Sequence, residues 1–273
     1  METIIVIEKR RKSRLINLKE LIDYKDLLYF LVVRGVKARY AQSVLGVGWA
    51  VIQPLSTMVV FTVVFGRLAG IESDGAPYAL FSMSGLVAWN FFSGALSDTS
   101  NSLVANAGML GKVYFPRLIL PLAGLLTKFL DFAISLVVLA VLMVAYRFMP
   151  SQQVVYFPLL IILMFTASLG PGLIAAAWSV QYRDIKYAMT FIIQVLMYTA
   201  PVVYPMSIVP EKYRLFYALN PLVGVVEGFR SSILGTTAMP WQAIGLSYLV
   251  SVLLLLYALY SFSKLERTFA DVA

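Results

Sequence analysis

Residues 26–55 read DLLYFLVVRGVKARYAQSVLGVGWAVIQPL, a basic segment that leads through a glycine-rich turn into the first long hydrophobic run. Four apolar side chains recur at i, i+4 spacing, which a helix would align as one stripe: Leu28, Val32, Val36 and Tyr40. Such a helix can lie in a bilayer interface with Arg34 and Lys37 facing headgroups or a partner, while Arg39 reaches past the stripe to water. The pattern therefore fits a helix that lies in the bilayer interface, and simple positive-inside anchoring next to the membrane explains the same residues equally well.

The composition is typical of a membrane protein. Of the 273 residues, 60% are hydrophobic and 13% are charged, and the mean hydropathy is +0.82. Soluble chains carry about 25% charged residues. Several apolar runs reach the about 20 residues that a helix needs to cross a hydrocarbon core, and the alternating pattern of a transmembrane barrel does not occur. The sequence predicts an all-α polytopic membrane protein with a single transmembrane domain over 1–273.

The chain contains no Cys and no His. This excludes disulfides, thiol nucleophiles, the common zinc ligands and the Ser-His or Cys-His pairs that activate a nucleophile, so no catalytic residue and no metal site is predicted. The Gly-x-x-x-x-Gly-Lys-Ser/Thr phosphate loop is also missing, and any ATP and Mg²⁺ must be bound by another chain. Membrane flanks that face anionic lipid explain the net charge of +8, and no nucleic-acid partner is expected.

Six spans are predicted from the apolar runs, at about 47–66, 78–97, 118–146, 154–178, 187–205 and 242–262. Residues 1–25 form a basic extension whose apolar run is too short for a signal peptide. Ten of the 22 Lys and Arg residues precede the first span. The positive-inside rule then places both termini in the cytoplasm.

Residues 206–235 are apolar enough to suggest a further span, but their sequence argues against one. Asn220-Pro221 would break the helix, and Glu227 and Arg230 would place charges near mid-membrane at a cost of about 2.5–3.5 kcal/mol each. A re-entrant or interfacial helical hairpin on the outer face costs less. There Glu227 and Arg230, three residues apart, can pair on one helix face.

A second charged pair lies inside the third predicted span. Lys128 and Asp131 share a helix face at i, i+3 spacing and can pair directly. One interpretation is an ion or proton site of a secondary transporter, and the other is a structural ion pair that faces the bundle interior. The structural interpretation is favoured, because proton-coupled transporters usually carry a chain of acidic or His groups within the membrane.

Two loops predicted on the cytoplasmic side are candidates for partner contact. The loop after the second span combines a short helical segment with glycine, basic and aromatic residues: Met109, Leu110, Gly111, Lys112, Tyr114, Phe115, Pro116 and Arg117. A short helix there suits docking into a partner's groove, although an ordinary connection has the same spacing. The second loop, 179–186, places Arg183 and Asp184 at a membrane exit.

Aromatic residues make up 14% of the chain, and belts at the membrane interfaces account for most of them. Tyr198 and Tyr204, in the fifth predicted span, can instead line a path along which sugar rings slide over flat faces. The belt interpretation is the simpler one at this stage.

Several of these stretches together resemble the ABC-2 type permeases that export polysaccharides, the membrane subunits of O-antigen, teichoic acid and capsule exporters. The matching segments occur in the family's order along almost the whole chain: RGVKARYAQSVLGVGW (34–49) with Gln53-Pro54, GKVYFPR (111–117), YRDI (182–185), PVVYP (201–205), and Asn220-Pro221 with EGFR (227–230). Each segment alone is a moderate signal, whereas the ordered set is specific. Residues before 25 lie outside the shared pattern.

The resemblance implies a multi-pass permease of the bacterial cytoplasmic (inner) membrane, in which two copies form the channel and two ATP-binding subunits dock beneath. It implies that 26–42 is an interface helix, that about 101–117 is the coupling loop inserting into the ATPase subunit, and that 206–235 forms the outer re-entrant helices. The implied cargo is a glycan carried on a polyprenyl diphosphate. Because Arg and Lys pair with phosphate oxygens, the candidate substrate entrance consists of Arg34, Lys37, Arg39, Tyr40 and Trp49.

Two other functions remain open from the residues alone. The same kind of permease can export a small molecule or a drug, and an ion-coupled secondary transporter would use Lys128 and Asp131. An integral-membrane enzyme is disfavoured, because no His, Cys or acidic cluster offers a catalytic set.

Overall fold

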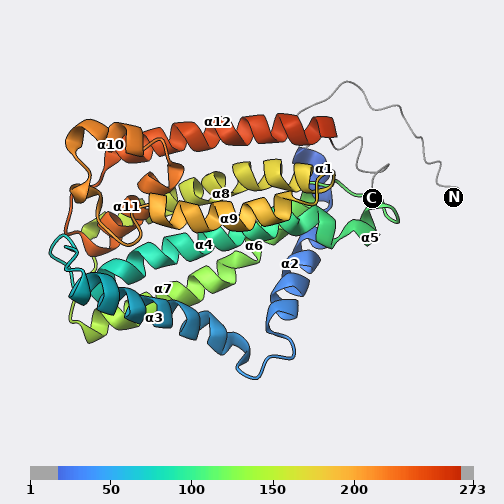
Figure 1. Ribbon diagram of the computed structural model, residues 1–273. Helices are drawn as coiled ribbons and strands as arrows, with labels where there is room; N and C mark the ends of the chain where they lie inside the picture. Colours follow the sequence, from blue (N-terminus) through green and yellow to red (C-terminus); the bar gives the residue numbers. More distant parts are fainter. Residues whose placement is uncertain (1–17, 266–273) are drawn as a thin grey trace, which may run out of the picture.

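The computed structural model describes residues 18–265, which form helices joined by turns, with no β-strand in that range. The long helices lie roughly parallel in one bundle (Figure 1). In chain order the segments are α1 (Leu18–Asp23), α2 (Lys25–Tyr40), η1 (Gly46–Gly48), α3 (Trp49–Phe61), η2 (Thr62–Leu68), α4 (Tyr78–Ala105), α5 (Ala107–Leu110), α6 (Ile119–Leu126), α7 (Lys128–Ala145), η3 (Gln152–Tyr156), α8 (Phe157–Ser179), α9 (Ile185–Thr199), η4 (Met206–Ile208), α10 (Glu211–Tyr217), α11 (Pro221–Leu234) and α12 (Trp241–Leu265). The predicted all-α class is confirmed. Most of the basic extension lies outside the described residues. Both chain ends, for which a cytoplasmic location is predicted, lie outside them as well.

Five helical segments are long and apolar enough to cross a membrane: Gly46–Leu68, Tyr78–Ala105, Ile119–Ala145, Gln152–Ser179 and Trp241–Leu265. They match five of the six predicted spans, so the chain is a multi-pass membrane protein. The remaining predicted span, 187–205, corresponds to a shorter apolar helix. This helix, α9, has 15 residues and ends at Thr199. Ala200 is extended, with ψ of 152°, as expected for a residue that precedes a proline.

The helix ends sort into two groups (Figure 1). α1, α2 and α5 lie at one end of the bundle with the last turn of α12, and α10 and α11 lie near the opposite end. The two loops predicted as cytoplasmic are neighbours, because the Ser179 hydroxyl at the end of α8 donates to the Ser100 carbonyl near the end of α4 at 3.1 Å. The predicted interface helix and partner loops therefore share one end, and the predicted re-entrant region occupies the other.

α4 forms the centre of the bundle and is buried along most of its length. It packs against α6, α7, α8 and α11. Contact with α8 is close, because a Cβ on Gly172 would lie 2.7 Å from Cγ2 of Thr99, and small residues permit such approach between membrane helices. α3 and α9 differ from α4, since they expose apolar side chains such as Val59, Val60 and Phe191.

The interface helix α2 is oriented differently from the expectation. Leu28 and Val32 of the predicted stripe pack, together with Leu31, against the core of the bundle. Tyr29 and Phe30 point outward and are 71% and 60% exposed. Leu28, Val32 and Tyr40 of the stripe therefore contact protein, since Tyr40 bonds to Asp131, and the face with the two aromatic rings is the one open to lipid or a partner.

Two other predicted segments are divided. The third span is interrupted at Thr127 between α6 and α7, where the Thr127 hydroxyl donates to the Gly124 carbonyl at 2.6 Å and so competes with the helical hydrogen bonds. The region 206–235 forms two successive helices, α10 and α11. Asn220 caps α11, because its side chain accepts from the Leu222 amide at 3.1 Å.

Candidate functional site

The predicted interface helix, α2, is held against the bundle by a close approach of its backbone. A Cβ on Gly35 would lie 2.6 Å from Cγ2 of Thr127, at the junction of α6 and α7. Glycine is the residue that permits this distance, because it has no side chain. Four and five residues later, Arg39 and Tyr40 reach charged side chains of α4 and α7.

Arg39 joins α2 to two helices of the bundle. Its Nη2 lies 2.5 Å from Oδ2 of Asp98 in α4, and its Nη1 donates to Oδ2 of Asp131 in α7. The Tyr40 hydroxyl donates to the other oxygen of Asp131, and Nζ of Lys128 lies 3.1 Å from Asp98. We call these five residues the Arg39 network; its two cations and two carboxylates balance in charge, and charge-assisted hydrogen bonds of this kind are among the strongest in proteins.

The Arg39 network corrects the pairing predicted within the third span. In the part of the chain that the structure describes, Lys128 pairs with Asp98, and Asp131 pairs with Arg39, so the direct pair of Lys128 with Asp131 is replaced. Lys128 reaches Asp98 by lying across α4 at Gly94, where a Cβ would be 2.9 Å from the Lys128 Cε. Sequence spacing considers one helix at a time, and for this reason it missed Asp98.

The hydroxyl of Tyr40 acts as a hydrogen-bond donor in this network. Burial, together with the hydrogen bond to Asp131 and the charge of that carboxylate, raises the pKa of Tyr40 to about 12. The phenol is therefore protonated at neutral pH and can donate to Asp131. This links the last residue of α2 to α7.

The predicted coupling loop is fixed to α1 and α2. Nη1 of Arg34 lies 3.8 Å from the sulfur of Met109, and the Tyr114 hydroxyl donates to Oε1 of Glu20 at 3.0 Å. The Tyr24 hydroxyl donates in turn to the Tyr114 carbonyl at 3.4 Å. The loop and the two N-terminal helices are therefore in contact at several points.

The residues of the loop differ in exposure. Leu110, Phe115 and Pro116 are buried against the bundle, Arg117 and Met109 are partly buried, and Gly111, Lys112 and Tyr114 are exposed. Arg183 and Asp184, in the turn between α8 and α9, are exposed as well. The exposed residues of the two loops are therefore the ones that another protein can reach at this end of the bundle.

The five residues predicted as a substrate entrance do not form one group. Arg39 and Tyr40 are engaged in the Arg39 network. Arg34 and Lys37 are exposed on α2, and Trp49, at the start of α3, is 51% exposed. A ligand outside the bundle can therefore reach Arg34, Lys37 and Trp49, whereas the other two serve a structural role.

Glu227 and Arg230 of α11 form a buried ion pair at the opposite end, with 2.7 Å between Nη1 of Arg230 and Oε1 of Glu227. Nη2 of Arg230 donates to the Pro201 carbonyl at 2.8 Å, where the chain has left α9. The guanidinium carbon lies 3.6 Å from the centre of the Phe81 ring in α4. The pair therefore connects the segment after α9 to α11 and α4. The contact of Arg230 with Phe81 was not predicted from the sequence.

The two predicted channel tyrosines have different environments. Tyr198 is 70% exposed on α9. The Tyr204 hydroxyl donates to the Tyr198 carbonyl at 3.1 Å and lies 2.9 Å from the Tyr217 hydroxyl. Tyr198 therefore presents a free aromatic face, whereas Tyr204 connects the end of α9 to α10. Among residues 18–265, no three acidic side chains gather in a way that could hold a metal ion.

These observations define a class: a polytopic helical membrane protein with one helix, α2, held across one end and two short successive helices, α10 and α11, at the other. The chain belongs to the ABC-2 type transporter family, whose model matches residues 26–234. The match extends from the interface helix α2 to the end of α11.

Individual relatives are similar along three quarters or more of the chain. An O-antigen export system permease protein RfbA of Myxococcus xanthus is 29% identical, over 93% of this chain and 97% of the relative. An RfbA of Klebsiella pneumoniae is 27% identical, over 90% and 95%. The polysialic acid transport protein KpsM of Escherichia coli is 20% identical, over 75% and 80%.

Proposed function

We propose that this chain is the permease subunit of an ATP-driven exporter that moves a lipid-linked polysaccharide across the bacterial cytoplasmic membrane. The observation that carries this proposal is the end-to-end similarity to two proteins named as O-antigen export permeases, at 27% and 29% identity. The similarity to a polysialic acid transport protein supports the same class of cargo. A polysaccharide cargo is favoured over a small molecule for this reason.

The proposed assembly contains two copies of this chain and two ATP-binding subunits. The exposed apolar faces of α3 and α9 suit a contact between copies within the membrane. ATP and Mg²⁺ are assigned to the partner subunits, since this chain has no phosphate loop. Six crossings are proposed, with the segment after Thr199 completing the passage of α9, so that both termini are cytoplasmic.

The contacts at the cytoplasmic end support a path for energy transfer. In the proposed mechanism, ATP binding brings the partner subunits together and moves the coupling loop. Because Met109 and Tyr114 of this loop contact α2 and α1, α2 moves with it. The Arg39 network then carries the motion of α2 to α4 and α7.

The exposed cations of α2 are proposed to receive the substrate. Arg34 and Lys37 can pair with the oxygens of a polyprenyl diphosphate, and Trp49 and Tyr198 offer flat faces to sugar rings. Anchoring by lipid headgroups uses the same cations, so both roles can be filled by one pair of residues.

Deletion of the gene, followed by complementation, tests the function. We expect loss of surface polysaccharide and accumulation of undecorated glycan inside the cell, both restored by the wild-type gene. Gly111→Pro should leave the protein in the membrane and fail to restore export, whereas Gly245→Ala, on an open helix face with no neighbour within 4 Å, should restore it. An unchanged surface polysaccharide in the deletion strain would contradict the proposal.

A further inference from the structure

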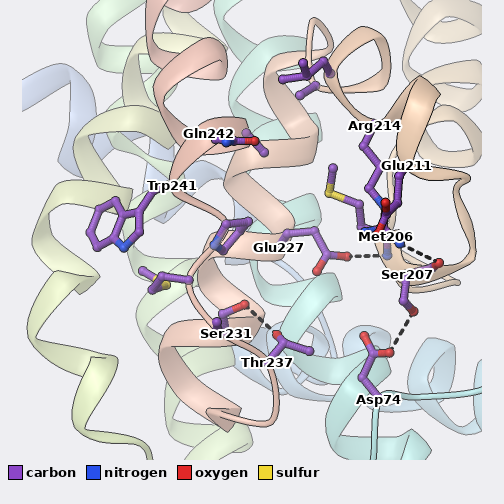
Figure 2. Close-up of a pocket in the computed structure, with 16 residues that line it drawn as sticks. Asp74, Met206, Ser207, Glu211, Arg214, Glu227, Ser231, Thr237, Trp241 and Gln242 are labelled. Carbon is purple, nitrogen blue, oxygen red and sulfur yellow. Dashed lines mark hydrogen bonds and ion pairs between the residues drawn. The ribbon is translucent and has the colours of Figure 1, made fainter.

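A pocket of about 690 Å³ lies near the end of the bundle that carries α10 and α11. It is an open pocket lined by residues of α10, α11, the start of α12 and the turn before α4 (Figure 2). Its polar lining includes carboxylates, hydroxyls and one amide: Asp74, Glu211, Glu227, Ser231, Thr237 and Gln242. Apolar side chains, among them Leu215 and Met239, complete the wall. A concave site with an apolar wall and a few polar groups is typical of a small-ligand site.

Glu227 directs one carboxylate oxygen into this pocket. The residue is 4% exposed, and its Oε1 accepts both from the Met206 amide at 3.1 Å and from Arg230 at 2.7 Å. Figure 2 shows the second oxygen pointing into the open space of the pocket. Because a carboxylate oxygen has lone pairs that accept hydrogen bonds, a ligand with a hydroxyl group can donate to it.

The charges around the pocket favour a neutral ligand over a cation. Glu227 is paired with Arg230, and Glu211 lies 3.8 Å from Arg214. Asp74 accepts from the Ser207 hydroxyl at 2.8 Å. Two of the three carboxylates therefore have a cation and the third has a hydroxyl donor, so most of the negative charge of the pocket is compensated while its oxygens remain available as hydrogen-bond acceptors.

The hydroxyl groups of the pocket retain hydrogen-bonding capacity. Ser231 and Thr237 are paired at 2.9 Å, which uses one donor of the two hydroxyls and leaves acceptor lone pairs and the second donor. The side chain of Gln242, at the start of α12, is exposed and adds a carbonyl and an NH₂ group. Donors and acceptors placed around an apolar wall match a pyranose ring, which has hydroxyl groups at its edge and C–H groups on its faces.

We propose that this pocket binds one neutral sugar unit of the exported glycan on the outer side of the membrane. The preference for a polyhydroxyl ligand rests on the contacts of the pocket, whereas the source of the sugar rests on the proposed export function. The site lies at the opposite end of the bundle from Arg34 and Lys37, so it would hold the glycan after its passage.

Binding is tested with the purified permease in lipid nanodiscs by saturation-transfer NMR. The probes are oligosaccharide fragments of the surface polysaccharide of the host strain and, separately, methyl glycosides of hexoses that do not occur in it. Thr237→Val and Gln242→Leu remove polar groups at the rim without touching the buried ion pair. Thr236→Val is the matched control, since it makes the same change at the neighbouring residue, which is exposed and does not line the pocket.

We expect the fragments to bind to the wild type and to Thr236→Val, and to lose about tenfold in affinity for each rim variant, the effect of one lost hydrogen bond. Absence of binding, or equal binding by all four proteins, would overturn the proposed site. Preferential binding of the foreign glycosides would overturn the glycan as its source. Failure of the export function is seen separately, as normal surface polysaccharide in the deletion strain, and does not affect the binding measurement.

Discussion

Arg39 and Asp98 are 59 residues apart in the chain, yet Nη2 of Arg39 lies 2.5 Å from Oδ2 of Asp98. This contact joins a helix at one end of the bundle to its central helix, α4. Since the same guanidinium also binds Asp131 in α7, a movement of α2 is transmitted to two helices. The position of α2 therefore depends on two carboxylates that belong to other helices, Asp98 of α4 and Asp131 of α7.

Removal of the charge at position 98 should uncouple the transporter. Asp98→Asn retains the shape of the side chain and weakens its bonds to Arg39 and Lys128, at a cost to folding of about 1 kcal/mol for a pair that is partly exposed. We expect the complex to assemble with its ATP-binding subunit and to hydrolyse ATP, while export falls. Both activities are measured in proteoliposomes, with Lys25→Gln, a change at an exposed residue of α2, as the control. Full export by Asp98→Asn would contradict the role of the network.

The packing of α2 on the α6–α7 junction should be sensitive to a single methyl group. Gly35→Ala places a Cβ at 2.6 Å from Cγ2 of Thr127, and overpacking of this kind costs about 1–3 kcal/mol. The thermal unfolding temperature in detergent should therefore fall. Thr127→Ser removes Cγ2, so the double variant should recover most of the loss. If the double variant were no more stable than Gly35→Ala, the proposed contact would be wrong.

The buried pair in α11 should be strongly coupled. Arg230→Met leaves Glu227 without its cation and should destabilise the protein by about 3–5 kcal/mol, whereas Glu227→Gln combined with Arg230→Met should cost less than the single change. Unfolding is followed by size-exclusion chromatography after heating. Additive losses in the double variant would argue against a direct interaction.

The hydrogen bond of Tyr40 should give a dependence on alkaline pH. Its pKa is raised from 10.0 to about 12 in the folded protein, so the stabilisation is fully present below pH 10 and is lost as the pH rises toward 12. Between these values, the unfolding temperature of Tyr40→Phe should fall less than that of the wild type. Parallel curves for the two proteins would show that the phenol is not a donor to Asp131.

Local sequence signals predicted most of the helical architecture. Long apolar runs and prolines act within one segment, through its contact with lipid and its own backbone hydrogen bonds. Five of the predicted spans are accordingly present as long apolar helices. The early end of α9 follows from Pro201, which was visible in the sequence but was included in the predicted span. The spacing of Glu227 and Arg230 likewise describes neighbours on a single helix.

The partners of the remaining charges were decided by tertiary structure. The i, i+3 spacing of Lys128 and Asp131 allows a direct pair, but the packing of α2 and α4 brings Arg39 and Asp98 closer and offers each charge a partner on another helix. The apolar stripe of α2 was likewise visible in the sequence, whereas its contact with protein instead of lipid depends on how Gly35 meets Thr127. Periodicity and charge thus determine which segments form helices and enter the membrane, because these are properties of one segment. Pairing and orientation depend on the relative positions of several helices, and only the folded chain specifies them.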